Sequence, residues 1–243
     1  MNIKQLTCLL GLTISCSVQA DTLSFSVGGG AWNASPSGSF QKTIDPLAVD
    51  VESNLFWEEE SQGYLFATLE HFVPIIPNVR IIHTAMDHSG SGNTSFTFDG
   101  TNYTGNVSNE FSIETTDIIA YYEVLDNVVS LDLGLNIRSL KVDYTISSVA
   151  DSTTDSLSET VPMLYALVGA SPLPGLIISG EISYIALDGS SISDITAKVA
   201  YTTSFLVGVE AGYRKQTFEL DDVSDTNSKL DFDGIFAGAY IKF

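Results

Sequence analysis

Cysteine is almost absent from the sequence. The only two cysteines, Cys8 and Cys16, lie near the amino terminus. Beyond residue 16 the chain therefore has no disulfide, no thiolate metal site and no cysteine nucleophile. No other cofactor-binding motif is found, and we expect neither a cofactor nor a dedicated metal site.

Basic residues are also scarce. The chain has 10 Lys and Arg against 30 Asp and Glu, which gives a formal net charge of −20 at pH 7. Binding to nucleic acid requires a basic surface that neutralises phosphate charge, so the composition excludes nucleic acid as a partner. The chain is nevertheless 44% hydrophobic, which excludes simple disorder. We infer two populations of residues, one facing lipid or a core and the other facing water.

Long apolar runs are missing as well. A transmembrane helix needs about 20 consecutive apolar residues, and no such run follows residue 20. Only helices and closed barrels satisfy every backbone hydrogen bond within lipid. If the chain crosses a membrane, it must therefore cross it with strands.

The amino terminus has the pattern of a secretory signal peptide. Lys4 is followed by an apolar run from Leu6 to Cys16, and small residues stand at the −3 and −1 positions before Asp21. We predict that residues 1–20 are a signal peptide cleaved after Ala20, and that residues 21–243 form the mature domain. A buried amino-terminal helix is the alternative.

Alternation of apolar and polar residues dominates the rest of the chain. Apolar residues occupy every second position in three of the clearest segments, at 129–137, 176–184 and 205–213. A period of two places these side chains on one face of a β-strand. No convincing pattern with the helical period of 3.6 appears, and no linker divides the chain, so we predict one all-β domain.

The turn-forming residues between these segments predict the number of strands. We place strands near residues 22–33, 62–73, 77–88, 113–125, 127–146, 158–170, 174–188, 193–203, 204–220 and 228–243. Short turns alternate with longer polar loops at 34–61, 89–112, 147–157, 189–192 and 221–227, and in the second of these loops Asp99 and Gly100 predict a hairpin turn. Outer-membrane barrels have short periplasmic turns, longer outside loops and an even number of strands. We therefore predict a transmembrane, antiparallel, up-and-down β-barrel of about ten strands, with eight or twelve as alternatives.

The last strand carries a second signal for this fold. Its apolar face, formed by alternate residues from Ile235 onward, ends in the aromatic residue Phe243. Outer-membrane barrels characteristically end in this way. We interpret Tyr240, Ile241 and Phe243 as the signal read by the barrel-assembly machinery, which would be a partner during biogenesis. A buried strand of a soluble protein is the alternative.

Three stretches resemble a known family. They are 69–80, which begins Leu-Glu-His-Phe-Val-Pro-Ile-Ile-Pro-Asn, then 117–127, which contains Tyr-Tyr-Glu-Val-Leu-Asp-Asn, and the strand 128–135 that continues the second. Together with the glycine-rich opening at 28–32, they are similar to a group of functionally uncharacterised proteobacterial outer-membrane β-barrel proteins. That family usually has proline where Phe72 stands. The resemblance implies the fold and the outer membrane, but no catalytic residues.

Charged residues alternate with the apolar faces and should point into the barrel. On this assignment the putative lumen charge network comprises Glu70, Arg80, Asp117, Glu123, Asp132, Arg138, Glu181, Lys198, Glu210 and Arg214. A barrel of about eight strands is filled by its own side chains, and unpaired buried charge is costly. We therefore expect paired charges, with Asp117 or Glu123 as the first candidates for the partner of Arg138. A narrow polar pathway or a ligand pocket is the alternative.

The chain has few groups suited to catalysis. Its three histidines are His71 beside a predicted turn, His83 on the lipid-facing phase, and His88 at the outer rim beside Asp87. Only His88 qualifies as a catalytic base, and a solvated surface histidine is the simpler interpretation. The sequence therefore disfavours a surface hydrolase, and we predict that the protein is not an enzyme.

The function best predicted is that of an integral outer-membrane protein with a structural or surface-interacting role. The alternative is a narrow channel or binding barrel for small solutes. We expect a monomer whose partners are outer-membrane lipids and lipopolysaccharide. Acidic residues in the loops could bridge to lipopolysaccharide through divalent ions, although none has the spacing of a calcium-binding loop.

The predicted location in the outer membrane is testable by cell fractionation. The mature chain should begin at Asp21, because the signal pattern ends at Ala20. It should be recovered with the outer membrane and resist extraction by salt. Recovery as a soluble periplasmic protein would contradict the barrel interpretation.

Overall fold

A computed structural model describes residues 23–223 and 225–243, which form eleven β-strands. The predicted signal peptide, residues 1–20, lies outside the described residues. No helix in the described part is long and apolar enough to cross a membrane. The strands are β1 (Ser24–Lys42), β2 (Val49–Asp50), β3 (Glu60–Glu70), β4 (Asn78–Phe98), β5 (Thr101–Asp126), β6 (Val129–Ser147), β7 (Ser152–Leu173), β8 (Leu176–Leu187), β9 (Ser190–Thr202), β10 (Val207–Val223) and β11 (Thr226–Lys242).

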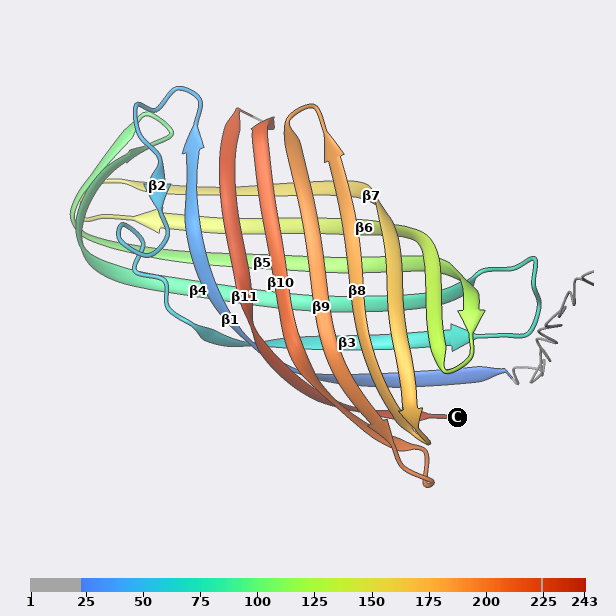
Figure 1. The fold of residues 1–243 in the computed structure, drawn as a ribbon. Helices are drawn as coiled ribbons and strands as arrows, with labels where there is room; N and C mark the ends of the chain where they lie inside the picture. The colour runs from blue at the N-terminus through green and yellow to red at the C-terminus, as the bar shows by residue number, and fades with distance from the viewer. Residues whose placement is uncertain (1–22, 224) are drawn as a thin grey trace, which may run out of the picture.

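Ten of these strands close into a ring (Figure 1). From β3 to β11 each strand pairs antiparallel with the next, β1 pairs with β3, and β11 returns to pair with β1. The two-residue strand β2 is an addition at the edge of β1. This topology confirms the predicted antiparallel up-and-down barrel and its ten-strand ring. The two ends of the described chain lie at one end of the barrel, here called the terminal end, and the opposite end is called the distal end (Figure 1).

The strands extend further at the distal end than the sequence predicted. The predicted loop at 89–112 is one continuous hairpin of β4 and β5, and most of the predicted loop at 147–157 belongs to β6 and β7. Asp99 and Gly100 form the predicted hairpin turn, and both have positive φ, as a type I′ turn requires. The loop prediction was wrong because these distal strand segments carry polar residues on their outer face. Among the described connections at the distal end, the segment 43–59 is the long one. The predicted contrast between long distal loops and short terminal turns is therefore confined to this segment.

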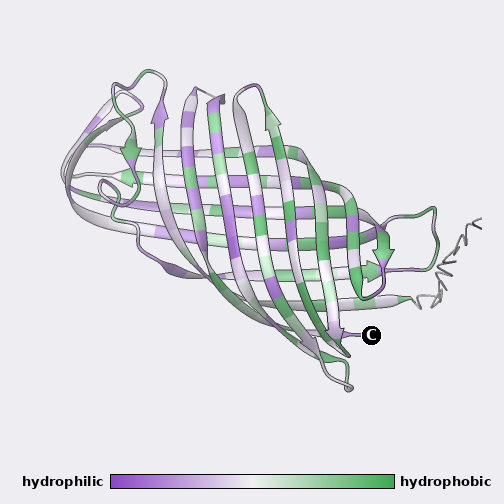
Figure 2. Cartoon of the chain, in the orientation of Figure 1, coloured by the Kyte–Doolittle hydropathy of each residue, from purple (hydrophilic) through white to green (hydrophobic). Residues whose placement is uncertain are grey.

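The two faces of the strands differ as the period of two predicts. On β6, Leu133, Leu135 and Ile137 are exposed on the outer face, whereas Asp132 and Arg138 are buried inside. Figure 2 shows the same alternation of hydrophobic and hydrophilic residues along the other strands. An exposed apolar outer face and a polar interior are the arrangement expected of a barrel whose surrounding solvent is lipid.

Exposed aromatic residues mark the height of the lipid-facing band. Phe72, Tyr122, Tyr201, Phe205 and Phe243 are exposed at or near the terminal end, whereas Tyr184 and Tyr213 are exposed further toward the distal end. Outer-membrane barrels carry such aromatic girdles at both membrane interfaces. The apolar outer residues between these two levels therefore form the membrane-facing belt.

The distal half of the barrel is built as two facing sheets. Pairing between β7 and β8 ends at Leu164 and Tyr184, so β7 from Ser152 to Met163 pairs with β6 but not with β8. In Figure 1 the distal parts of β4–β7 run to the left, while those of β8–β11 and β1 rise to the top. A buried apolar cluster, which includes Phe111 and Phe232, lies between the two sheets.

The segment 43–59 closes the gap on the other side of the barrel, between β3 and β4. The Trp57 indole donates to Asn109 Oδ1 at 2.7 Å. The buried Asp45 carboxylate accepts the backbone N–H groups of Asp99 and Gly100 at 2.7 and 2.9 Å. The segment is therefore fastened both to the apolar cluster and to the tip of the β4–β5 hairpin.

The outer face of β6 gives a direct test of the membrane assignment. Leu133 lies at the centre of the exposed apolar row, so Leu133→Arg should cost about 2–4 kcal/mol of folding free energy, measured by urea unfolding in lipid vesicles. Ser139→Arg, on the same face but beyond that row, should cost about 1 kcal/mol or less. Single cysteines should react with a membrane-restricted probe at position 133 and not at 132. Equal costs for the two arginine variants, or the reverse labelling, would contradict the assignment.

Candidate functional site: charged layers across the barrel interior

Arg138 and Asp117 form the centre of the charged interior. They lie directly opposite each other on β6 and β5. Arg138 donates from Nε and Nη2 to the two Asp117 carboxylate oxygens, at 2.7 and 2.9 Å. Both side chains are no more than 2% exposed. Such bidentate geometry gives the strongest class of ion-pair hydrogen bond.

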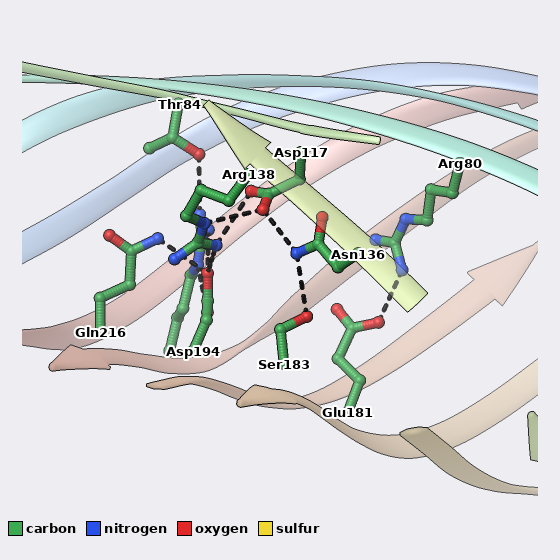
Figure 3. A network of polar contacts seen from close by, with 10 residues as sticks. Arg80, Thr84, Asp117, Asn136, Arg138, Glu181, Ser183, Asp194 and Gln216 are labelled. Carbon is green, nitrogen blue, oxygen red and sulfur yellow. Dashed lines mark hydrogen bonds and ion pairs between the residues drawn. The ribbon is translucent and has the colours of Figure 1, made fainter. Parts of the chain in front are cut away.

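Asp194 joins this pair to the opposite wall of the barrel. It stands on β9, and its Oδ2 accepts hydrogen bonds from Arg138 Nη2 at 2.5 Å and from Arg214 Nη2 at 2.7 Å (Figure 3). Arg214, on β10, also donates to Thr84 of β4 at 2.9 Å and lies 5.1 Å over the Trp32 ring. The layer therefore spans the lumen and contains two arginines and two aspartates, whose charges balance.

A second charged layer lies nearer the terminal end. Arg80 donates to Glu181 at 2.6 Å, and Lys198 contacts Glu210 at 3.3 Å. Tyrosine hydroxyls complete both pairs, since Tyr165 donates to Glu181 and Tyr64 donates to Glu210 at 3.2 and 2.8 Å. Gly30 on β1 and Gly238 on β11 leave the space that the Tyr64 hydroxyl occupies, because a Cβ at either position would overlap it. This layer also contains two cations and two anions.

The remaining predicted network residues lie close to the terminal end. Glu70 accepts a hydrogen bond from Tyr121 at 3.1 Å and contacts Lys242 at 3.7 Å. Asp132 is buried, and its Oδ1 has no hydrogen-bond partner. Glu123 is exposed and lines, with Glu70 and Asp132, a vestibule of about 400 Å³.

Several residues of the first layer were not identified from the sequence. Asp194 is the most important of them, although it shares the phase of Lys198 on the same strand, which is the signal that would have found it. Asn136 donates to Asp117 at 2.6 Å and to Ser183 at 3.1 Å, and Gln216 donates to Asp194 at 2.8 Å. Neutral side chains carry no charge pattern, so alternation alone does not mark them as members of a network.

The two layers leave little free space between them. The cavity bounded by Arg80, Asp117, Arg138, Asp194 and their neighbours has a volume of about 50 Å³. A water molecule needs about 10–15 Å³ on this scale, so the space admits a few waters at most. Chemically, the arrangement holds charges in fixed pairs across the lumen.

His88 does not lie where the sequence predicted it. It is buried at 2% exposure inside the barrel, with its ring stacked on those of Trp57 and Phe232 at 5.2 and 5.4 Å. The prediction of a rim position was wrong because β4 continues ten residues beyond His88, which leaves this residue within the wall. Asp87 is exposed on the opposite face of the strand.

The other two histidines have structural contacts. His71 contacts the Pro77 carbonyl oxygen at 3.2 Å and so ties together the turn between β3 and β4. His83 contacts the Thr116 hydroxyl at 3.0 Å across the outer face. In the described part of the chain, no three His, Cys, Asp or Glu side chains are grouped to hold a metal ion.

The residues interpreted as an assembly signal occupy both faces of β11. Ile241 and Phe243 are exposed on the outer face, and the Phe243 ring stacks on Phe25 of β1 at 6.2 Å. Tyr240 is partly buried, and its hydroxyl contacts that of Thr202 at 2.7 Å.

Comparisons with known proteins identify the fold. No known family profile and no curated protein matches the chain. Among solved structures, the outer membrane protease OmpT of Escherichia coli is similar with a TM-score of 0.56 and 8% identity, over 93% of this chain and 99% of that one. The translocator domain of the autotransporter NalP of Neisseria meningitidis has a TM-score of 0.47 and 11% identity, over 93% and 90% of the two chains. The attachment invasion locus protein Ail of Yersinia pestis has a TM-score of 0.39 and 13% identity, over 92% and 100%. The chain thus has the fold of an outer-membrane β-barrel.

Proposed function

We propose that the protein is a closed, non-catalytic barrel with a structural or surface-interacting role in the outer membrane. It would belong to the group of uncharacterised proteobacterial barrels that its motifs resemble. The mature chain would begin at Asp21 and act as a monomer. The terminal end would face the periplasm and the distal end the exterior, as in other outer-membrane barrels.

The observation that carries this proposal is the charged layer centred on Arg138. Two arginines and two aspartates from β5, β6, β9 and β10 contact one another across the lumen. Separating them to open a path would leave buried charges without partners, which costs about 3–5 kcal/mol for each broken pair. A plugged lumen supports a structural role over a channel.

A surface-interacting role is supported by the charge of the distal end. Its turns, the adjoining strand ends and the segment 43–59 expose a set of carboxylates: Glu52, Glu58, Glu59, Asp99, Asp151, Asp155, Asp188, Asp221, Asp222 and Asp225. Lipopolysaccharide is the partner present at this surface if the distal end faces the exterior of the outer membrane. Divalent ions would bridge its phosphates to these carboxylates.

A catalytic role has less support. General acid–base and nucleophilic catalysis require a base within hydrogen-bond reach of its partner. His71 and His83 contact a carbonyl and a threonine, and His88 is enclosed by aromatic rings. The similarity to OmpT extends to the fold alone, so the protease activity of OmpT does not support the same activity for this chain.

A small-solute channel is the competing function, and the vestibule of about 400 Å³ at the terminal end favours it.

Planar-bilayer recordings distinguish the two functions. The purified mature protein should show no large, stable, porin-like conductance, because the charged layers leave only about 50 Å³ between them. Steady large openings of the unmodified protein would overturn the proposal.

A double-mutant cycle tests whether the charged layer holds the barrel together. Arg138→Ala should destabilise the barrel by about 3–5 kcal/mol, because Asp117 loses its buried partner. Arg138→Ala/Asp117→Ala should recover part of this loss, since no unpaired carboxylate remains at that position. Urea unfolding in lipid vesicles, followed by the shift of the folded band on unheated gels, measures both changes.

Lys141→Ala is the matched control on the same strand. Lys141 pairs with Asp143 at 2.5 Å, but the two side chains are 51% and 45% exposed. Exposed pairs contribute about 1 kcal/mol or less, so this variant should be nearly neutral. If Arg138→Ala were as mild as the control, the charged layer would not be a structural element.

A further inference from the structure

The apolar cluster of the distal half encloses a cavity that the charged layers do not explain. Its volume is about 290 Å³, and it lies between the inner faces of β5, β6 and β7 on one side and of β10, β11 and β1 on the other. An apolar cavity of about 150 Å³ stays dry and binds benzene, and small-molecule sites in proteins begin at about 300 Å³. The cavity is therefore of a size to hold a small molecule.

The walls of this cavity are mostly hydrocarbon and aromatic. Phe111, Leu140 and Val142 line one side, and Phe218 and Phe232 line the other. Lys42 and Asp155 are the charged residues among the lining side chains of the described chain. A charged ligand would lose its hydration against these rings. An uncharged apolar ligand would bury its surface at no such cost.

The gap between β7 and β8 opens the cavity to the outside of the barrel wall, beyond the apolar belt. The two strands stop pairing at Leu164 and Tyr184, which are both exposed on the outer face. The next outer residues on β9 and β10 are Ser193 and Thr217, so the apolar belt ends at this level. Leu157 belongs to the unpaired part of β7 and lines the cavity.

The two sides of the distal half are closed differently. The gap between β3 and β4 is covered by the segment 43–59, which contributes the fully buried Val49, Val51 and Leu55. The β7–β8 gap has no such cover among the described residues. Within the described chain, the wall around the cavity is therefore left open at the β7–β8 gap.

We propose that this cavity is a binding site for an uncharged hydrocarbon, which enters through the β7–β8 gap. The hydrocarbon is either a free small molecule or the end of a lipid acyl chain that reaches past the edge of the apolar belt. Binding would not require the lumen to open, because the cavity lies on the distal side of the charged layers.

The fluorescence of Trp57 can report binding, since Trp57 lines the cavity and Trp32 does not. Mature protein in nanodiscs should be titrated with bromooctane, whose bromine quenches tryptophan fluorescence on close contact. The unmodified protein should show saturable quenching, and Trp57→Phe should lose it. A second preparation with lipids brominated on their acyl chains distinguishes a lipid chain from a free hydrocarbon as the occupant.

Two matched variants on β6 separate binding in the cavity from partition into lipid. Leu140→Phe/Val142→Phe fills the cavity and should weaken the saturable quenching about tenfold or more, a loss of about 1.4 kcal/mol or more. Leu133→Phe/Leu135→Phe introduces two phenylalanines at the same spacing on the lipid face and should leave the saturable quenching intact. Both should first be shown to fold by their band shift on unheated gels. Quenching that is linear, or equal in all variants and with both probes, would overturn the proposal.

Discussion

The buried contact of Arg138 with Asp117 and Asp194 is the interaction on which the rest of the structure depends. Lipid accepts only the apolar face of each strand, so every polar face must turn inward. Inside, charges remain tolerable only when they are paired and hydrogen-bonded. Arg138 meets both requirements, because its guanidinium reaches a neighbouring strand and the opposite wall at once.

This pairing divides the barrel into regions with different chemistry. Toward the terminal end, two balanced charged layers and a carboxylate-lined vestibule follow one another along the axis. Toward the distal end, the two sheets part, and aromatic and aliphatic side chains line the space between them. The charged layers therefore act as a floor beneath the apolar cavity and separate it from the vestibule.

Much of the fold was predictable because a β-strand repeats every two residues. The outer row on β6, the ten-strand ring and the hairpin turn at Asp99 and Gly100 all follow from local patterns. The distal extensions of β4–β7 were missed because their outer faces contact water rather than lipid. Polar residues there resemble those of a loop, while inward-facing residues such as Tyr103 and Val107 are buried.

The candidate site was predictable only in part, for a physical reason. Alternation along one strand determines which side chains face inward, so the sequence by itself determined that Arg138 and Asp117 lie in the interior. Which inward residues meet across the lumen depends on the closure and stagger of the whole ring. Only the tertiary structure decided that Asp194 joins Arg138 to Arg214, that His88 is enclosed by Trp57, and that a cavity lies between two parting sheets.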